Sequence, residues 1–213
     1  MITVTELSKS YGSQVLFWDA NLKLNTNNCY GIVGANGSGK STLLRILSGQ
    51  ESADDGEIKM PKDVRIGTLN QDHFQYEDTP IIEVVMMGHE QLWSALQEQE
   101  QIIACEDGEF DSDRYAEVED IILSLDGYAF ESRAAEILNG LNIPTEQHWE
   151  KLAILSGGYK LRALLGQVLA SDPDILILDE PTNHLDIISI DWLEGFLQRY
   201  KGLAIVVSHD HRF

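Results

Sequence analysis

The fold of this chain is constrained most by a glycine-rich turn, Gly34-Ala-Asn-Gly-Ser-Gly-Lys-Ser41, which lies between two apolar stretches. The stretch before the turn, Tyr30–Val33, predicts a short strand, and Thr42–Leu47 predicts the helix after it. Glycines allow backbone N–H groups to curl around an anion at a helix N-terminus, where the helix dipole favours negative charge. The sequence therefore predicts a strand–loop–helix unit that holds a phosphate.

The turn has the spacing G-x-x-x-x-G-K-[ST], in which the lysine reaches the β- and γ-phosphates of a nucleotide and the hydroxyl ligates Mg²⁺. A glycine-rich turn without a ligand is the alternative, but the strand before it and the helix after it favour nucleotide binding. The residues expected to bind the nucleotide are Gly34, Ala35, Asn36, Gly37, Ser38, Gly39, Lys40, Ser41 and Thr42, with Ser41 also a Mg²⁺ ligand.

Two neighbouring carboxylates, Asp179 and Glu180, follow the apolar strand candidate Ile175–Leu178. Open α/β folds bind ligands at the carboxyl edge of the sheet, where these two side chains are expected. Adjacent strand residues point to opposite faces, which predicts different tasks for the two carboxylates. One can hold Mg²⁺ through its water shell while the other faces a nucleophilic water, as phosphoryl transfer requires. Solvated acids at a strand end are the alternative.

Strand candidates alternate with helix candidates, which indicates an α/β fold. Ile175–Leu178 and Leu203–Val207 are continuous apolar runs, typical of strands buried on both faces of a parallel sheet. The other candidates are short β-branched or alternating stretches bounded by turn residues. They are Ile2–Leu7, Gln14–Phe17, Cys29–Val33 and Val64–Leu69.

The charge of the chain is concentrated in its middle. The net charge is −20, from 15 Lys and Arg against 35 Asp and Glu. The segment 72–150 contains 20 of the acidic residues and two basic ones, a net charge of −18, and leaves −2 for the remainder. An acidic surface argues against a chain that wraps nucleic acid, because binding phosphates needs clustered Lys and Arg.

The acidic segment also has helical periodicity. Apolar residues recur at helical spacing over 92–103 and again over 115–125, and the polar, glycine-containing 105–113 between them predicts a loop. These patterns predict an acidic helical hairpin, followed by a third helix near Glu131–Leu138 that is closed by Asn139-Gly140. A solvated charged face on helices that pack into the core is the alternative interpretation of the charge.

Several classes of protein are disfavoured by what the sequence lacks. The two cysteines, Cys29 and Cys105, do not make a disulfide framework or a metal-ligand spacing, and are expected to be free thiols in a reducing compartment. Residues 1–20 do not have the pattern of a signal peptide. No apolar run reaches the roughly 18 residues that span a bilayer. We therefore expect a cytoplasmic chain that does not insert into membranes.

The order of these features resembles the nucleotide-binding domain of ABC ATPases, over essentially the whole chain. Leu155-Ser-Gly-Gly158 is followed by the helix-like Tyr159–Ala170 and then by the strand that ends in Asp179-Glu180. The resemblance implies a P-loop NTPase core with a mostly parallel sheet, an N-terminal antiparallel β-subdomain and an inserted helical subdomain. It implies one such domain over 1–213, within which 72–150 is an acidic helical insertion or arm.

The resemblance also implies ATP and Mg²⁺ as ligands, and hydrolysis of ATP as the activity. Glu180 would polarise the attacking water, with Gln71 and His209 as catalytic partners, and Ser41, Gln71 and Asp179 would serve the metal. Tyr11 is similar in position to the aromatic that stacks on adenine. Ser156, Gly157 and Gly158 resemble the signature that contacts the γ-phosphate held by a partner domain, and Asp186 resembles the D-loop.

The branch of the family is indicated by Asn183-His-Leu-Asp186, which is similar to the ABC-F subfamily. Met87–Trp93, Gly140–Pro144 and Gln147-His148 further resemble its bacterial YbiT-like group. ABC-F proteins have two nucleotide-binding domains in one chain, no membrane domain, and act on ribosomes. The resemblance thus implies an ATP-driven switch in translation, whereas the ATP-binding subunit of a membrane transporter is the alternative.

The partners implied are a second ABC domain or a second copy, either of which would complete the ATP sites, and the ribosome, but not DNA. The family continues beyond the position of Phe213, so we expect a truncated first domain that hydrolyses ATP weakly alone. His209 and His211 would share one face of a strand, an arrangement that suits two ligands of one metal ion. Because no third ligand has a suitable spacing, we do not expect a metal there.

Overall fold

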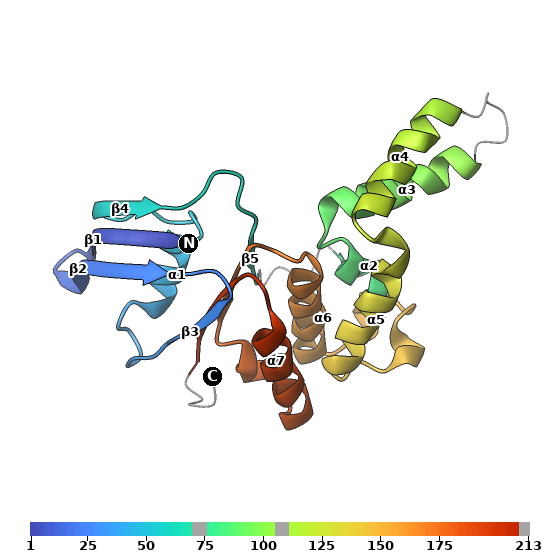
Figure 1. Ribbon diagram of the computed structural model, residues 1–213. Coiled ribbons are helices and arrows are strands. Elements are labelled where there is room, and N and C mark those ends of the chain that lie inside the picture. Colours follow the sequence, from blue (N-terminus) through green and yellow to red (C-terminus); the bar gives the residue numbers. More distant parts are fainter. Residues whose placement is uncertain (70–75, 105–110, 209–213) are drawn as a thin grey trace. The chain divides into compact units, whose positions relative to one another are not determined.

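The computed structural model describes residues 1–69, 76–104 and 111–208 (Figure 1). Gln71, His209 and His211 therefore lie outside the described residues. The contacts divide the chain into two compact units, one from Met1–Asn70 and Pro173–Phe213 and the other from Gln71–Asp172. The second unit is thus inserted in the first, and it contains the acidic segment together with the helix that follows the Ser156-Gly-Gly sequence.

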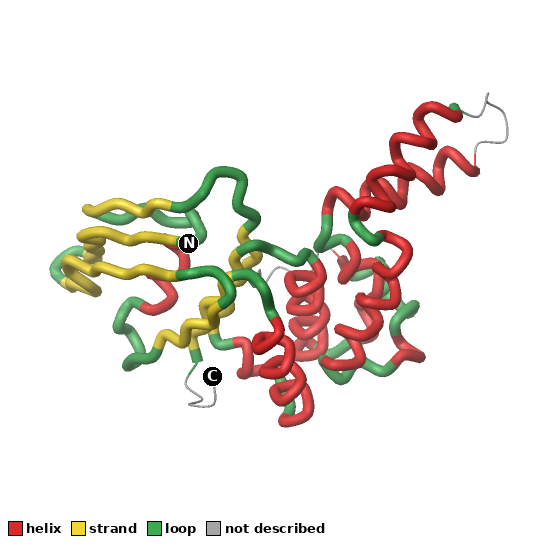
Figure 2. The backbone as a smooth tube through the Cα atoms, viewed as in Figure 1, coloured by secondary structure: helices red, strands yellow, loops and turns green. Residues whose placement is uncertain are grey.

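The first unit begins with an antiparallel sheet (Figure 2). Its strands are β1 (Ile2–Tyr11), β2 (Gln14–Leu24) and β4 (Asp55–Lys59), in the order β2-β1-β4. β1 and β2 form a hairpin from Ile2 opposite Leu24 to Tyr11 opposite Gln14. The pairing is irregular where Glu6 and Asp19 adopt left-handed backbone angles, each with φ of 52°. The antiparallel β-subdomain expected from the sequence is present.

A parallel sheet forms the rest of the first unit. Its strands are β3 (Asn28–Ile32), β5 (Ile66–Thr68), β6 (Ile175–Asp179) and β7 (Leu203–Val207), in the order β3-β7-β6-β5. β7 and the first four residues of β6 are buried, as their continuous apolar sequences predict for central strands. In the register of the two strands, Asp179 lies opposite Val207. The α/β class predicted from the sequence is therefore confirmed.

Among its described residues, the first unit also contains the α-helices α1 (Lys40–Leu47) and α7 (Ile187–Arg199). α1 buries Leu44, Ile46 and Leu47 in a core that it shares with residues of both sheets, including Ile2 and Ile205. Because α1 is anchored by this face, the position of its N-terminus is fixed relative to β6. A single 3₁₀ turn, Pro181–His184, connects β6 to the segment that leads into α7.

The second unit is helical. It consists of α2 (Ile81–Met86), α3 (Glu90–Ala104), α4 (Ser112–Ser124), α5 (Phe130–Gly140) and α6 (Gly157–Ala170). Short 3₁₀ turns at Gly127–Ala129, Thr145–Gln147 and Leu152–Ile154 connect them. α2, α5 and α6 pack together, whereas α3 and α4 form a hairpin that projects from these helices (Figure 1).

The hairpin carries its acidic side chains mostly on exposed positions, and one cation joins its two helices. Arg114 Nε lies 2.5 Å from Glu98 Oε1 on α3, and Arg114 Nη1 lies 2.8 Å from Glu117 Oε2 on its own helix. Leu92 and Ala95 on α3 and Val118 and Ile122 on α4 are buried. The predicted hairpin of two acidic helices is present in the described residues.

Several elements differ from the sequence predictions. β4, α2 and α7 were not predicted, and β1 and β2 extend beyond the predicted Ile2–Leu7 and Gln14–Phe17. α5 continues through Gly140 instead of ending at Asn139-Gly140. The left-handed residue after α5 is Asn142, with φ of 60°, and Ile143 N–H returns to the carbonyl oxygen of Leu138 at 2.9 Å. The turn that closes α5 is therefore displaced by two residues, because Leu141 and Ile143 are both fully buried.

The second unit includes one very close approach of backbone to backbone. A Cβ atom added at Gly88, just after α2, would lie 1.9 Å from the carbonyl oxygen of Gln167 on α6. The side chain of Gln167 also donates from Nε2 to the carbonyl oxygen of Val84, at 2.8 Å. Only glycine fits at position 88.

In the part of the chain that the structure describes, no helix is long and apolar enough to cross a membrane.

Candidate nucleotide site

The glycine-rich turn connects β3 to α1 and is shaped by two left-handed glycines. Gly37 has φ of 78° and Gly39, which caps α1, has φ of 94°. Ser38 N–H donates to the carbonyl oxygen of Ala35 at 3.2 Å, and Leu43 N–H donates to that of Gly39 at 2.8 Å. A Cβ atom at Gly39 would lie 3.0 Å from Cβ of Leu16. The loop therefore needs glycine here for its backbone angles and for its closeness to β2.

The N-terminus of α1 has the features of an anion site. No side chain among the described residues caps it, and its first turn contains no acidic residue. The first N–H groups of a helix have no partner within the helix, and its dipole favours an anion beside them. Lys40 Nζ donates to the carbonyl oxygens of Gly34 and Ala35, at 2.9 and 3.2 Å. This cation is held within the loop, at the place where a phosphate would meet it.

Asp179 and Glu180 lie at the carboxyl end of β6. The strand ends at Asp179, and Glu180 has a left-handed conformation with φ of 49° and ψ of 50°. Glu180 N–H donates to the carbonyl oxygen of Val207 at 2.9 Å, which holds this bend against β7. The prediction of opposite faces assumed that both residues belong to a strand, but the strand ends at Asp179. Asp179 and Glu180 both line the same pocket.

That pocket has a volume of about 460 Å³. Tyr11, which is half exposed, lines it together with residues of the loop and with Asp179 and Glu180. Ser41 and Asp179 line it together and fit Mg²⁺, which is usually bound by one or two protein oxygens, waters and the phosphates of the substrate. The residues that line it are Tyr11, Gln14, Leu16, Asn36, Gly37, Gly39, Lys40, Ser41, Thr42, Asp179 and Glu180.

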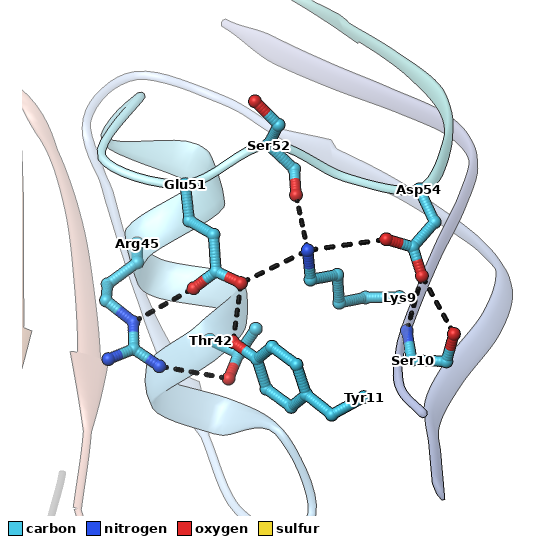
Figure 3. Close-up of polar contacts among 8 residues, drawn as sticks. All are labelled: Lys9, Ser10, Tyr11, Thr42, Arg45, Glu51, Ser52 and Asp54. Carbon is cyan, nitrogen blue, oxygen red and sulfur yellow. Dashed lines mark hydrogen bonds and ion pairs between the residues drawn. The ribbon is translucent and has the colours of Figure 1, made fainter. Parts of the chain in front are cut away.

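A polar network lies behind Tyr11 and was missed by sequence reasoning (Figure 3). Tyr11 donates its phenol O–H to Glu51 Oε1 at 2.5 Å, and Lys9 Nζ lies 3.2 Å from the same oxygen. The phenol of Tyr11, and after it Lys9 and Arg45, hold the pKa of Glu51 below its ordinary value, against the opposing effect of burial. Partners about 40 positions apart leave no local pattern, so only the structure could identify this network.

The Ser156-Gly-Gly sequence lies in the second unit, at the N-terminus of α6. Ser156 is exposed and occupies the N-cap position, but in the described part of the chain its side chain makes no capping hydrogen bond. Lys160 N–H donates to the carbonyl oxygen of Ser156 at 2.9 Å. A Cβ atom added at Gly157 or Gly158 would meet nothing within 4 Å. These residues form an open helix terminus.

Asp186, the other residue expected to serve the nucleotide, caps α7. Its Oδ1 accepts from Ser189 N–H at 2.9 Å, so its side chain has a structural task in this unit. Asn183 N–H donates to the carbonyl oxygen of Glu180 at 3.3 Å, which ties the Asn183-His-Leu-Asp segment to the bend after β6. Gln71 and His209 lie outside the described residues. Their expected roles therefore stay predictions.

Comparison with known proteins identifies the family. Residues 17–183 match the family described as ABC transporter. YkpA of Bacillus subtilis, an uncharacterized ABC transporter ATP-binding protein, is 44% identical over 214 residues, which cover 100% of this chain and 40% of YkpA. YbiT of Escherichia coli O157:H7, a probable ATP-binding protein, is 42% identical over 214 residues, with the same two coverages. The ATP-binding protein Uup of Haemophilus influenzae is 38% identical and covered to 33%.

Solved structures agree on the fold. The ATP-binding subunit of an ABC transporter has a TM-score of 0.69 at 18% identity, and the match covers 98% of this chain and 79% of the subunit. The cassette MJ0796, as a dimer bound to ADP and Pi, has a TM-score of 0.65 at 22% identity, with coverages of 100% and 89%. The chain spans about two fifths of the length of its relatives YkpA and YbiT. The expected ABC-type fold and the resemblance to ABC-F proteins are both confirmed.

Proposed function

Because this chain belongs to the ABC transporter family of ATP-binding domains, we propose that it binds ATP with Mg²⁺ in the pocket between the glycine-rich loop and the end of β6, and hydrolyses it. The observation that carries the proposal is the convergence of Lys40, Ser41 and both carboxylates on one pocket. A phosphate chain at the N-terminus of α1 would meet N–H donors, a helix dipole and a lysine together.

Each group in the pocket has a task that its position favours. Tyr11 offers a ring on which the base stacks, and Lys40 leaves its loop carbonyls to pair with the β- and γ-phosphates. Ser41 and Asp179 hold Mg²⁺, which would neutralise charge on the phosphate oxygens. Glu180 orients and polarises the attacking water, and accepts its proton. Gln71 and His209 are proposed to fix the nucleophile and the γ-phosphate.

The N-terminus of α6 supports a site that two domains share. Ser156 and Gly157 are exposed and Gly158 is half-buried, in a unit that does not include the phosphate loop. We place these residues against the γ-phosphate of a nucleotide held by a second ABC domain or a second copy of this chain. The cassette MJ0796, which is described as dimeric with ADP and Pi bound, supports this arrangement. Closure around ATP and opening after hydrolysis would then act as a switch.

For the whole protein we propose a cytoplasmic ABC-F factor that acts on the ribosome. The proposal is supported by Asn183-His-Leu-Asp186 and by the identity to YbiT and Uup, whose names describe ATP-binding proteins. The acidic hairpin of α3 and α4 would contact basic protein more readily than bare RNA, because like charges repel. DNA is not expected as a partner for the same reason.

The test separates binding from chemistry. Calorimetric titration with Mg²⁺ and ATP measures affinity, and phosphate release at high chain concentration measures turnover. Glu180→Gln should bind ATP within about twofold of the parent and lose turnover by about 100-fold or more, the loss typical of a missing general base. Lys40→Ala should lose affinity by at least about tenfold, because a charge-assisted contact with phosphate is removed.

Glu57→Gln is the control, because Glu57 lies on β4, is exposed, and is ion-paired only to its neighbour Lys59 among the described residues. It should leave both affinity and turnover unchanged. Failure of the parent chain to bind ATP would refute the nucleotide site. Equal turnover by Glu180→Gln and the parent would refute the role of Glu180 alone.

A further inference from the structure

Glu51 joins three segments of the first unit, two of which, β1 and α1, contribute residues to the nucleotide pocket (Figure 3). It lies in the connection between α1 and β4, and its side chain is about four-fifths buried, with a relative exposure of 21%. Oε1 contacts Tyr11 and Lys9 of β1, and Oε2 contacts Arg45 of α1 at 3.3 Å. No motif in the sequence includes Glu51.

These contacts restrict the ring of Tyr11. A tyrosine side chain has two main torsions, and fixing its O–H end leaves little freedom in either. The hydrogen bond to Glu51 is a charge-assisted one at 2.5 Å. Lys9 Nζ lies over the ring, 5.4 Å from its centroid, and is itself paired to Glu51. The carboxylate therefore fixes both the phenol and the cation beside the ring.

The same carboxylate connects the ring to the phosphate end of the pocket. Arg45, which pairs with Glu51, donates from Nη2 to Thr42 Oγ1 at 3.3 Å. Thr42 lies in the first turn of α1 and lines the pocket. Glu51 and Arg45 thus link the ring to Thr42 through side-chain contacts.

We propose that Glu51 is a positioning residue for the base: it holds the Tyr11 ring in the orientation in which a nucleobase stacks on it. The proposal rests on the nucleotide site proposed above. Its consequence is specific, because the part of the affinity that comes from the base depends on Glu51, whereas the part that comes from the phosphates does not.

A purely structural role for Glu51 is distinguishable, because other contacts hold the same backbone segments together. Asp54 Oδ2 accepts from the N–H and the hydroxyl of Ser10, each at 2.8 Å. Lys9 Nζ donates to the carbonyl oxygen of Ser52 at 2.7 Å. Removing the Glu51 carboxylate leaves these bonds in place. Its loss should therefore free the ring without detaching the segment from β1.

The experiment compares two ligands on the same chain, MgATP and Mg²⁺ with inorganic tripolyphosphate, by calorimetric titration. Their affinity ratio isolates the contribution of the nucleoside. Ordering one flexible side chain on binding costs about two- to twelvefold in affinity, and Glu51→Ala should lower the ratio by about that factor. Glu51→Gln, whose amide oxygen still accepts from the phenol, should recover part of the loss. The matched control Glu57→Ala should leave the ratio unchanged.

Tyr11→Phe supplies the second arm, because it keeps the ring and removes only the hydroxyl that Glu51 holds. It should lower the ratio as much as Glu51→Ala does, and the double variant should show no further loss, since both changes remove the hydrogen bond that holds the ring. Thermal unfolding of each variant shows whether it is folded. If Glu51→Ala is unfolded, Glu51→Gln replaces it in the comparison of the two ligands.

Each outcome has one meaning. A reduced ratio with non-additive variants supports the proposal. An unchanged or increased ratio in Glu51→Ala overturns it, and so does an equal loss for both ligands, which is the signature of a structural role. If the parent chain binds neither ligand, the nucleotide site itself is refuted. If the parent binds both ligands and the variants have the same affinity ratio as the parent, only the role of Glu51 is refuted.

Discussion

Replacing Gly39 by alanine should damage the phosphate loop more than the same change at Gly37. Both residues are left-handed, and a residue with a Cβ atom pays about 1–2 kcal/mol for that conformation. The Cβ at position 37 would meet nothing within 4 Å, whereas the Cβ at position 39 would lie 3.0 Å from Leu16 Cβ and 3.4 Å from Phe17 Cδ1. Crowding a packed site adds about 1–3 kcal/mol.

The unfolded chain moderates both costs, because alanine has less conformational freedom there than glycine, a gain of about 0.4–1 kcal/mol. We therefore expect Gly37→Ala to lower the free energy of unfolding by less than about 2 kcal/mol, and Gly39→Ala by about 1–3 kcal/mol more than that. Urea unfolding followed by circular dichroism measures both values. Gly157→Ala is the control, since its Cβ has open space and its φ is not in the left-handed region.

ATP affinity supplies the second measurement. If Gly39→Ala distorts the loop, its affinity should fall well below that of Gly37→Ala under conditions in which both variants are folded. Equal free energies of unfolding for the two loop variants would refute the reasoning, since they would show that Leu16 and Phe17 move aside at no cost. A stable Gly39→Ala variant with the affinity of the parent would refute the need for glycine at this position.

Two other changes test the second unit. Ser156→Arg should leave the ATP affinity of the isolated chain within about twofold but reduce turnover by about tenfold or more. The reason is that a cation at the N-terminus of α6 disturbs only a phosphate supplied by the partner domain. A large loss of ATP affinity in the isolated chain would contradict this role of Ser156. Burial, and then the charge of Glu100, raises the pKa of Glu83 on α2, so the folded state favours the protonated acid and loses stability as pH rises through that pKa. Glu83→Gln should therefore raise the free energy of unfolding by less than about 1 kcal/mol at pH 7 and have less effect near pH 4. Thermal unfolding measured at both pH values tests this. A variant that is less stable than the parent at pH 7 would contradict the raised pKa of Glu83.

The sequence predicts those elements in which a local pattern and the tertiary environment agree. The apolar runs of β6 and β7 are buried in the parallel sheet, and the glycine-rich turn lies between β3 and α1 as expected. β4 has no such pattern, because four of its five residues are exposed and it exists through its pairing with β1. α2 is a six-residue segment with five apolar residues, too short for periodicity to assign it to helix or strand.

The site shows the same division between local and distant information. Lys40 and Ser41 were found from their spacing in the sequence. The left-handed bend at Glu180 was not predicted, because it is held by a hydrogen bond to Val207 on another strand. Glu51 was missed entirely, since its task is defined by Tyr11, 40 positions earlier, and by Arg45. The bend at Glu180 and the contacts of Glu51 depend on interactions between different segments of the chain, which no local sequence motif predicts.

The pairing of β5 with β6 has a consequence for how the chain folds. Arg65 N–H and Asp174 Oδ2, which lie 2.9 Å apart beside this pair of strands, are separated by 109 positions in the sequence. Contacts that close long loops slow folding, although the entropic cost of closure rises only with the logarithm of loop length. If the helices of the inserted unit form first, they shorten the effective loop. The rate at which this edge of the parallel sheet assembles would then depend on the stability of helices that contribute no residue to the sheet.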